Sequence, residues 1–435
     1  MRLLAARKHL VTVGLWLAVA ISTPVFAAGP QQTSSRPELA ATASNVRFDP
    51  VAATEAYLAK LTPEQRARSD AYFEGGYWLQ LWGFLYGVAV ALVLLATRLS
   101  ARMRDLAVRA TRIASLQTAF YWLQYLLVTT ILSFPLTVYQ GFFREHKYGL
   151  ATQTFGPWLG DQAKGLLVGA ILGGLTLVAI YAAIRRAPRT WWLWGAGVSV
   201  FFAVIAIAVA PVFIEPLFNT YTPLRDESIK GPILRLARAN GIPATDVFVV
   251  DASKQTTRVS ANVAGFLGTE RIALNDNLLK RCSLAEIEAV MGHEMGHYVL
   301  NHVYKGIVEF GVLIVIGFAF LRWSFDRASA RWGAQWGITG IADVAGLPLL
   351  VLLLSVFFFV TTPVTNTMIR TQEVEADIYG LNAARQPDAE AEVDLKLGEY
   401  RKLRPGSVEE FIFFDHPSGY NRILMAMRWK AENLP

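Results

Sequence analysis

Charged residues and cysteine are both scarce in this chain. Only 17% of its 435 residues are charged, whereas 53% are hydrophobic. Ordinary soluble domains contain about 25% charged residues, so the deficit favours a membrane protein. The single cysteine, Cys282, excludes an intramolecular disulfide and a cysteine-rich metal site. The sequence also lacks a nucleic-acid-binding motif, and we attribute its net charge of +7 to loop arginines that set membrane topology.

The first 28 residues have the pattern of a secretory signal peptide. A basic start is followed by an apolar stretch at 10–22 and by small residues suited to cleavage. An uncleaved membrane anchor is the alternative. We expect the next segment, 29–75, to be polar and to contain a short helix around 50–70.

Six long apolar segments follow, each close to the roughly 20 residues that cross a bilayer. Four fall within 76–213 and two within 306–364. The fifth contains Glu309, an acid of a kind that is rare in membrane spans. The sequence therefore predicts a mainly α-helical protein, a polytopic bundle of transmembrane helices in a lipid bilayer. The six segments are 77–97, 116–139, 165–184, 191–213, 306–322 and 344–364.

Two polar regions, 214–305 and 365–435, flank the last two predicted spans. We expect them to form an inserted α+β domain. Ser283, with Glu286 three residues later, forms a capping box that predicts the start of a helix. The elements expected in this domain are helices at 227–240 and 284–302 and strands at 247–250, 258–268 and 271–275.

The predicted helix at 284–302 carries the sequence His293-Glu294-Met295-Gly296-His297. Residues four apart share one face of a helix, so the two imidazoles can bind one metal ion together. Glu294 lies between them, where a carboxylate can act as the base toward a metal-bound water. The pattern predicts a hydrolytic zinc site. Two ordinary surface histidines are the alternative.

Zinc in a catalytic site needs a third protein ligand and an open position. Glu373 and Asp377 lie four residues apart, on a helix that we expect to follow the last span. We assign Glu373 as the candidate third ligand and Asp377 as the acceptor of a hydrogen bond from a ligating imidazole. Glu375 faces another side and is expected to be solvated. Acidic residues at this spacing also occur on ordinary helices.

Two further histidines and one arginine are candidates for roles beside the metal. His302 lies five residues after His297, off the ligand face, so we expect it to support a ligand rather than to bind the ion. His416 and Arg422 could donate to the oxyanion of a tetrahedral intermediate. A capped helix start is the alternative interpretation of 415–417.

Over most of residues 70–430 the chain resembles the integral-membrane zinc peptidases typified by the type I CAAX prenyl endopeptidase. The motifs that carry this resemblance are Ala71-Tyr72-Phe73-Glu74, Glu145-His146-Lys147-Tyr148-Gly149 with Thr154, Pro216-Leu217-Phe218-Asn219 with Thr222-Pro223-Leu224, Asp251-Ala252-Ser253-Lys254, Ser260-Ala261-Asn262, Arg271-Ile272 with Asp276 and Leu278-Leu279, Glu373 to Asp377, and His416-Pro417.

The resemblance implies a gluzincin-like fold with one Zn²⁺ per chain, Glu373 as the third ligand, and helices around a large chamber. It also implies that a peptide or protein substrate adds as a strand to the sheet edge near 258–265, where Asn262 would hold its backbone. This chain has Asn262-Val263-Ala264 where the family has Asn-Ala-Tyr. The family places the counterparts of His416 and Arg422 close to the zinc.

The predicted reaction is hydrolysis of a peptide bond. Zinc lowers the pKa of its bound water to about 7, Glu294 accepts the proton, and the same carboxyl returns a proton to the leaving amine. The substrates are peptides or membrane-associated proteins, with prenylated C-termini as the narrower alternative. A catalytically silent scaffold or chaperone with a structural zinc is an alternative of another class, but it would not need Glu294. A transporter would need more ionisable groups in its spans than Glu309.

Arginine is concentrated between the predicted spans, at 98–115, 185–190 and 322–331. Such clusters mark the cytoplasmic side of a membrane, and alternation of the spans then places both polar regions outside the cytoplasm. A cleaved signal peptide agrees with this orientation. The prenyl endopeptidase instead works from the cytosolic side. The charges of this exported, bacterial-type chain favour an extracytoplasmic site in an inner membrane.

Overall fold

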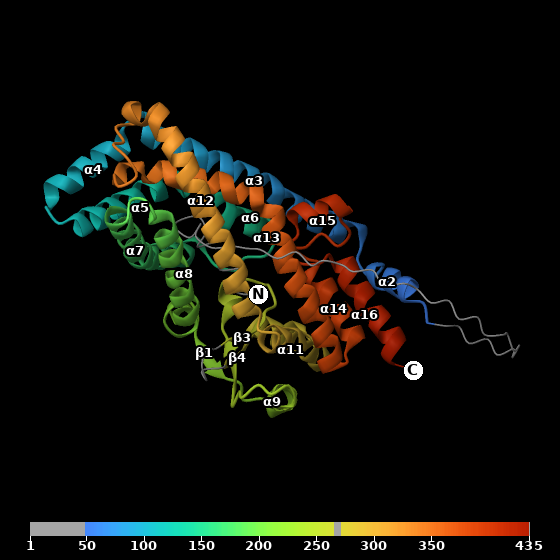
Figure 1. The fold of residues 1–435 in the computed structure, drawn as a ribbon. Helices are drawn as coiled ribbons and strands as arrows, with labels where there is room; N and C mark the ends of the chain where they lie inside the picture. Colours follow the sequence, from blue (N-terminus) through green and yellow to red (C-terminus); the bar gives the residue numbers. More distant parts are fainter. Residues whose placement is uncertain (1–47, 265–270, 435) are drawn as a thin grey trace, which may run out of the picture.

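The computed structural model describes residues 48–264 and 271–434, and Figure 1 shows them as a bundle of long helices with a small sheet toward one end. The signal peptide expected at 1–28 lies outside the described residues, as does the first part of the polar segment expected at 29–75. In the later part of that segment, where a short helix was expected around 50–70, α2 (Pro50–Leu58) is followed by the first turns of the next helix.

Six helices in the described residues are long and apolar enough to cross a membrane, which confirms the expected number. The helix predicted at 191–213 ends at Val209, whereas the others extend past at least one end of their apolar segments, because polar residues can continue the same backbone hydrogen bonding. The first begins at Pro63 rather than near residue 77, and Thr62 and Gln65 cap it. The six are α3 (Pro63–Ala96), α5 (Ala114–Val138), α7 (Phe155–Arg186), α8 (Trp191–Val209), α12 (His302–Trp336) and α13 (Leu347–Ala384).

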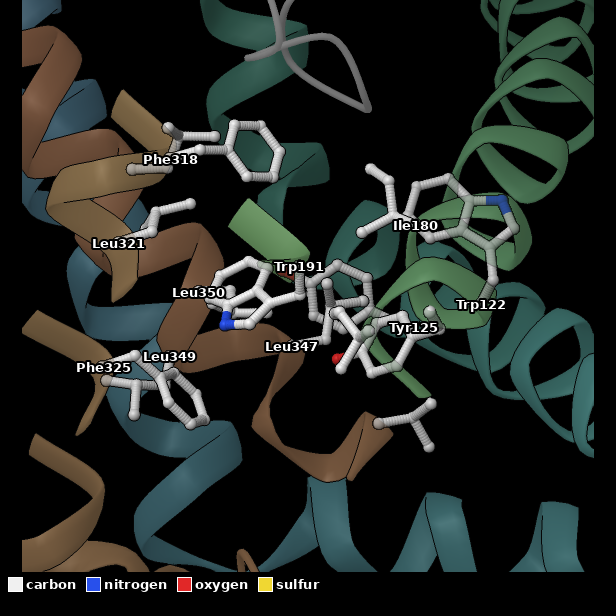
Figure 2. Packing of buried hydrophobic residues seen from close by; sticks show 14 of the residues in the cluster. Trp122, Tyr125, Ile180, Trp191, Phe318, Leu321, Phe325, Leu347, Leu349 and Leu350 are labelled. Atoms are coloured by element: carbon white, nitrogen blue, oxygen red, sulfur yellow. The ribbon is translucent and has the colours of Figure 1, made fainter. Parts of the chain in front are cut away.

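Aromatic and branched apolar side chains fill the interior of the bundle. Figure 2 shows Trp122 and Tyr125 of α5 and Trp191 of α8 together with Phe318 of α12 and Leu347 of α13. Lipid tails are as apolar as these side chains, so close packing rather than exclusion of water holds such helices together. The spans therefore form a defined scaffold for the elements that extend from them.

A four-stranded sheet lies beyond the bundle, in the order β1-β2-β4-β3. Strand β2 pairs parallel with β4, while β1 and β3 pair antiparallel with β2 and β4. The sequence did not predict β1, and the strand expected at 258–268 is described only over 261–264. Strand β3 is therefore an edge of the described sheet. The strands are β1 (Tyr221–Pro223), β2 (Val247–Val250), β3 (Ala261–Ala264) and β4 (Arg271–Asn275).

Helix α11 (Leu284–Val299) packs against α13 at unusually short range. A Cβ added at Gly380 would lie 2.7 Å from the backbone nitrogen of His293, and one at Gly292 would lie 2.9 Å from the carbonyl oxygen of Gly380. No other residue type fits this contact without moving a helix. The backbones of α11 and α13 therefore approach one another directly.

Two helix boundaries near this contact differ from the prediction. The helix expected at 284–302 ends at Val299, and Asn301 takes the left-handed conformation with φ 57° before α12 begins at His302. The helix expected to follow the last span is instead the same helix, because α13 continues unbroken through Pro363 to Ala384. In α12, Glu309 is buried and accepts a hydrogen bond from Gln372 of α13 at 2.8 Å.

The last part of the chain folds back on the first described part. Leu58 of α2 is buried in one cluster with Leu395, Ile423 and Met427. The remaining helices are α4 (Leu99–Ala110), η1 (Tyr139–Phe143), α6 (Arg144–Lys147), η2 (Ala210–Ile214), η3 (Glu215–Leu217), α9 (Glu227–Ala239), η4 (Ala252–Lys254), α10 (Asp276–Arg281), η5 (Val344–Gly346), α14 (Pro387–Leu397), α15 (Ser407–Phe413) and α16 (Gly419–Asn433).

Candidate metal centre

Two imidazoles of α11 and one carboxylate of α13 converge at a single point. The Nε2 atoms of His293 and His297 lie 3.1 Å apart. Glu373 Oε2 lies 3.3 Å from the first of these nitrogens, and Glu373 Oε1 lies 3.6 Å from the second. One ligand atom from each residue falls within 4.8 Å of the others. This arrangement can hold a metal ion, and Glu294, which is also buried, lies on the same helix.

The cap of α11 fixes where its ligand face begins. Ser283 N donates to Glu286 Oε2 at 2.6 Å, and the backbone of Glu286 donates to Ser283 Oγ at 3.4 Å. Lys396 of α14 forms an ion pair with Glu286. This predicted capping box anchors the helix whose third and fourth turns carry the two imidazoles, so a local sequence signal positions the candidate ligands.

The donor set fits a divalent ion of the zinc type. Glu373 Oε2 is buried and makes no hydrogen bond of good geometry, although His293 and His416 Nε2 lie 3.3 Å and 3.2 Å away. A buried carboxylate oxygen without a donor is costly unless it meets a cation. Two imidazoles and one carboxylate are a ligand set suited to zinc.

The outer nitrogen of His293 meets Asp377. The distance from His293 Nδ1 to Asp377 Oδ1 is 2.7 Å, and both side chains are buried. Burial disfavours the charged imidazole, but the hydrogen bond to Asp377 and the nearby carboxylate of Glu373 outweigh it and raise the pKa of His293 to about 10. The acids that stabilise a proton there would stabilise a cation in its place.

Arg422 of α16 is held by three buried acids rather than pointing at the metal-binding position. Its Nε and Nη2 donate to the two oxygens of Asp377 at 2.8 Å and 2.6 Å. Its Nη2 also meets Glu390 at 3.0 Å, and Nη1 meets Asp394 at 2.9 Å. The guanidinium therefore holds Asp377, which accepts the hydrogen bond from His293, in place. This geometry does not favour the expected contact of Arg422 with an oxyanion.

Two further buried acids beside Arg422, Glu390 and Asp394 of α14, were not among the residues predicted from the sequence. Their spacing of four residues, on a helix with an apolar face, was a signal that they share an interior side. Burial raises the pKa of Glu390 and raises the pKa of Asp394 well above its ordinary value, against the attraction of Arg422. Three acids surround a single arginine, and the excess of negative charge favours the protonated form of Asp394.

The outer nitrogen of His297 meets a histidine. Its Nδ1 lies 2.8 Å from Nδ1 of His302, whose Nε2 lies 3.0 Å from Glu375 Oε2. Glu375 also accepts from Lys305 at 2.8 Å. Glu375 was expected to be solvated, but it is bonded on the His302 side while 42% of its side chain stays exposed. Burial lowers the pKa of His297 to about 3, so its imidazole is neutral, as metal binding requires.

His416 also approaches Glu373, with its Nε2 3.2 Å from Glu373 Oε2. Its Nδ1 lies 2.9 Å from Asp415 Oδ1. The alternative interpretation, a helix cap at Asp415, does not hold, because Ser418 is the residue that caps α16. The buried Nε2 of His416 makes no hydrogen bond within the described residues.

Asn262 lies on the edge strand β3, opposite Ala273 of β4. Its Oδ1 is buried and lacks a hydrogen-bond partner within the described residues. A free strand edge offers backbone donors and acceptors to an added strand, and an unused amide oxygen beside it can accept from a peptide. The position is compatible with the substrate-binding role expected of Asn262.

Comparisons with known proteins agree over nearly the whole described chain. Residues 223–430 match the family described as Peptidase family M48, and residues 50–220 match the CAAX prenyl protease N-terminal domain with five membrane helices. The metalloprotease YhfN of Bacillus subtilis is 32% identical over 360 residues, which cover 81% of this chain and 84% of that protein.

Eukaryotic relatives align over shorter stretches. CAAX prenyl protease 1 of Saccharomyces cerevisiae is 35% identical over 183 residues, which cover 42% of this chain and only 40% of that protein. The crystal structure of S. mikatae Ste24p has the same fold, with a TM-score of 0.73 at 23% identity, covering 88% of this chain and 92% of that one.

We expect Arg422→Lys to lower the metal affinity and kcat/KM about 10- to 100-fold, because an ammonium cannot make the forked contact with Asp377. Zinc competition with a chromophoric chelator and peptide cleavage are the two measurements. Arg404→Lys, on an exposed arginine that pairs with Glu55, should match wild type within about twofold. Lower kcat with unchanged metal affinity would instead assign Arg422 to the oxyanion.

We expect Asp394→Asn to gain stability relative to wild type as the pH rises from about 5 to 8. The folded-state pKa of Asp394 is raised above 3.8, so the folded protein binds more protons than the unfolded chain above that pH and loses stability as pH rises. Asparagine removes this loss, which is at most about 1.4 kcal/mol per pH unit.

Thermal unfolding in detergent across this pH range measures the effect. Asp388→Asn on the same helix is the control with the opposite sign. Burial opposes ionisation of Asp388, but hydrogen bonds from Lys430 and Tyr57 outweigh it and lower its pKa. Its loss should therefore destabilise the protein at neutral pH. Parallel pH profiles for Asp394→Asn and wild type would contradict a proton on Asp394.

Proposed function

The chain belongs to peptidase family M48, and from that membership we propose that His293, His297 and Glu373 hold one zinc ion and that Glu294 is the catalytic base. The protein is a membrane-embedded zinc metalloendopeptidase, as the family and its relatives show. The assignment of its ligands is supported by the convergence of three ligand atoms within 4.8 Å. That convergence carries the proposal.

The chain's own residues account for the proton transfers. A zinc ion, when bound, would polarise a water molecule and the scissile carbonyl. Glu294 would accept the proton of that water during attack and deliver a proton to the leaving amine. His416, buried beside Glu373 with an unused Nε2, is the candidate donor to the developing oxyanion. Asp377 and His302 would orient the two ligating imidazoles through their outer nitrogens.

The substrate would bind as an extra strand on β3. Support comes from the position of that strand at the edge of the described sheet, in the order β1-β2-β4-β3, and from Oδ1 of Asn262, which has no partner among the described residues. Main-chain hydrogen bonds from such an edge recognise any extended peptide, whatever its sequence. We therefore propose peptides and membrane-associated proteins as general substrates. Prenylated C-termini are the second candidate, supported by the names of relatives that align over part of their length.

A catalytically silent scaffold with a structural zinc is less well supported. Structural zinc sites are closed by four protein ligands, whereas three ligand atoms converge here among the described residues. A scaffold would also have no use for Glu294, which lies between the two histidines in the sequence and is buried. An isolated buried carboxylate costs stability, so a chain without catalysis would be better served by an apolar residue there.

We propose that the site faces away from the cytoplasm of a bacterial inner membrane. The basic segments gather at one end of the bundle: Arg98 and Arg104 donate to carbonyls at 334–337, and Arg322 donates to that of Arg189. His302, beside the imidazoles, starts the helix that carries Arg322 about 20 residues later, which is about 30 Å along the axis. Arginine-rich ends mark the cytoplasmic side.

We expect Glu294→Gln to retain one zinc ion per chain and to lower kcat by about 100- to 10,000-fold, because the amide cannot accept the proton of the attacking water. Cleavage of a quenched fluorescent peptide by the purified full-length protein, with metal analysis of the same sample, measures both. Glu288→Gln, on the same helix and bonded to Gln386, is the matched control and should leave kcat unchanged. Full activity of Glu294→Gln would remove this residue as the base.

We expect a reporter that is active only outside the cytoplasm to work when fused after residue 435, because the C-terminal helices pack beside the site. The same reporter fused after residue 189, in a basic turn, should be inactive, and a fluorescent protein that matures only in the cytoplasm should show the opposite pattern. Strong cytoplasmic fluorescence from the fusion at residue 435 would reverse the proposed orientation.

A further inference from the structure

Glu375 and His302 form a hydrogen-bonded chain that ends on the outer nitrogen of His297. We infer that Glu375 is a positioning residue for the metal centre, which acts through His302 to decide which nitrogen of His297 faces the metal. This inference rests on the proposed function of His297 as a ligand. It assigns a role to Glu375 and Lys305, neither of which the catalytic proposal uses.

The chain has three links, each at hydrogen-bond distance. His297 Nδ1 lies 2.8 Å from His302 Nδ1, and His302 Nε2 lies 3.0 Å from Glu375 Oε2. Lys305 Nζ lies 3.0 Å and 2.8 Å from the two oxygens of Glu375. His302 is buried, while 42% of the Glu375 side chain and 33% of the Lys305 side chain are exposed. The chain therefore runs from the ligand to the surface.

The carboxylate at the outer end determines the proton positions along the whole chain. A carboxylate only accepts hydrogen bonds, so His302 Nε2 must carry a proton and donate it to Glu375. The neutral His302 then has a bare Nδ1, which must accept from Nδ1–H of His297. In neutral His297 the remaining nitrogen, Nε2, is left with a free lone pair, and this is the atom that faces His293 and Glu373.

The turn between α11 and α12 makes this chain possible. Asn301 takes a left-handed conformation, so His302 leaves the face on which a continued helix would have placed it. The ring of His302 then meets that of His297 with 73° between their planes, at a centroid distance of 4.9 Å. His293 contacts the carboxylate of Asp377 directly, whereas His297 contacts the imidazole of His302. His297 therefore needs a second group, Glu375, to set its tautomer.

We expect Glu375→Met, which removes the acceptor but keeps the length of the side chain, to weaken zinc binding about 10- to 100-fold. Lys305→Met leaves the acceptor in place and should cost less than Glu375→Met. Glu392→Gln is the control on an exposed acid that pairs with Lys60, and it should match wild type. The probe is Zn²⁺ itself, in competition with a chromophoric chelator, on the full-length protein in detergent.

Two replacements of His302 distinguish the loss of its hydrogen bond to His297 from the loss of its side-chain volume. His302→Asn can still offer an oxygen near the position of Nδ1 and should retain most of the zinc affinity, whereas His302→Leu should lose as much as Glu375→Met. The absorption spectrum of the Co²⁺-substituted protein should change in His302→Leu and Glu375→Met, because the ligand field reports the angle of the imidazole. Thermal unfolding of the metal-free variants checks that each one folds.

Wild-type zinc affinity and an unaltered Co²⁺ spectrum in Glu375→Met would overturn the inference, as would equal losses in His302→Asn and His302→Leu. A wild-type protein that binds no zinc, or a Glu294→Gln variant that stays active, would overturn the proposed function instead. The two failures are distinguishable because the first leaves wild-type hydrolysis and metal content intact.

Discussion

The proposed metal centre depends on a direct backbone contact between α11 and α13. Gly292 and Gly380 face each other so closely that an added Cβ would fall 2.7 Å to 2.9 Å from main-chain atoms of the other helix. Only this approach lets a carboxylate of one helix reach two imidazoles of the other. Since α13 is also the last membrane span, the packing of the bundle sets the distance between Glu373 and its partners. The helix bundle and the proposed metal site therefore share one helix, α13.

Buried charge is balanced by pairing on both sides of the site. His293 is backed by Asp377, which is braced by Arg422 and by two more acids of α14. His297 is backed by a neutral imidazole whose own partner lies near the surface. Unpaired ions at such depth would cost several kcal/mol each, so these networks are a condition for placing a metal here. They also join α11, α12, α13, α14 and α16 around one point.

These networks connect helices of both polar regions. They explain why the two regions fold as one although two spans separate them in the chain. Val393 and Leu397 of α14 are buried in the same cluster as Ile287 and Met291 of α11. The proposed metal ligands are therefore held by helices from both regions. Helices α12 and α13 continue from their apolar segments into the proposed site without a linker.

The sequence by itself determined the six spans, the start of α11 at Ser283, and the shared face of His293 and His297. These follow from backbone periodicity and from caps, which depend on residues a few positions apart. Tertiary structure decided the rest. It set the partner of Arg422, 45 residues from Asp377, and the hydrogen bond of Glu375 to His302, 73 residues away. It also made α13 one continuous helix and ended α11 at Val299. Such contacts follow from how whole helices pack, and no local pattern contains that information.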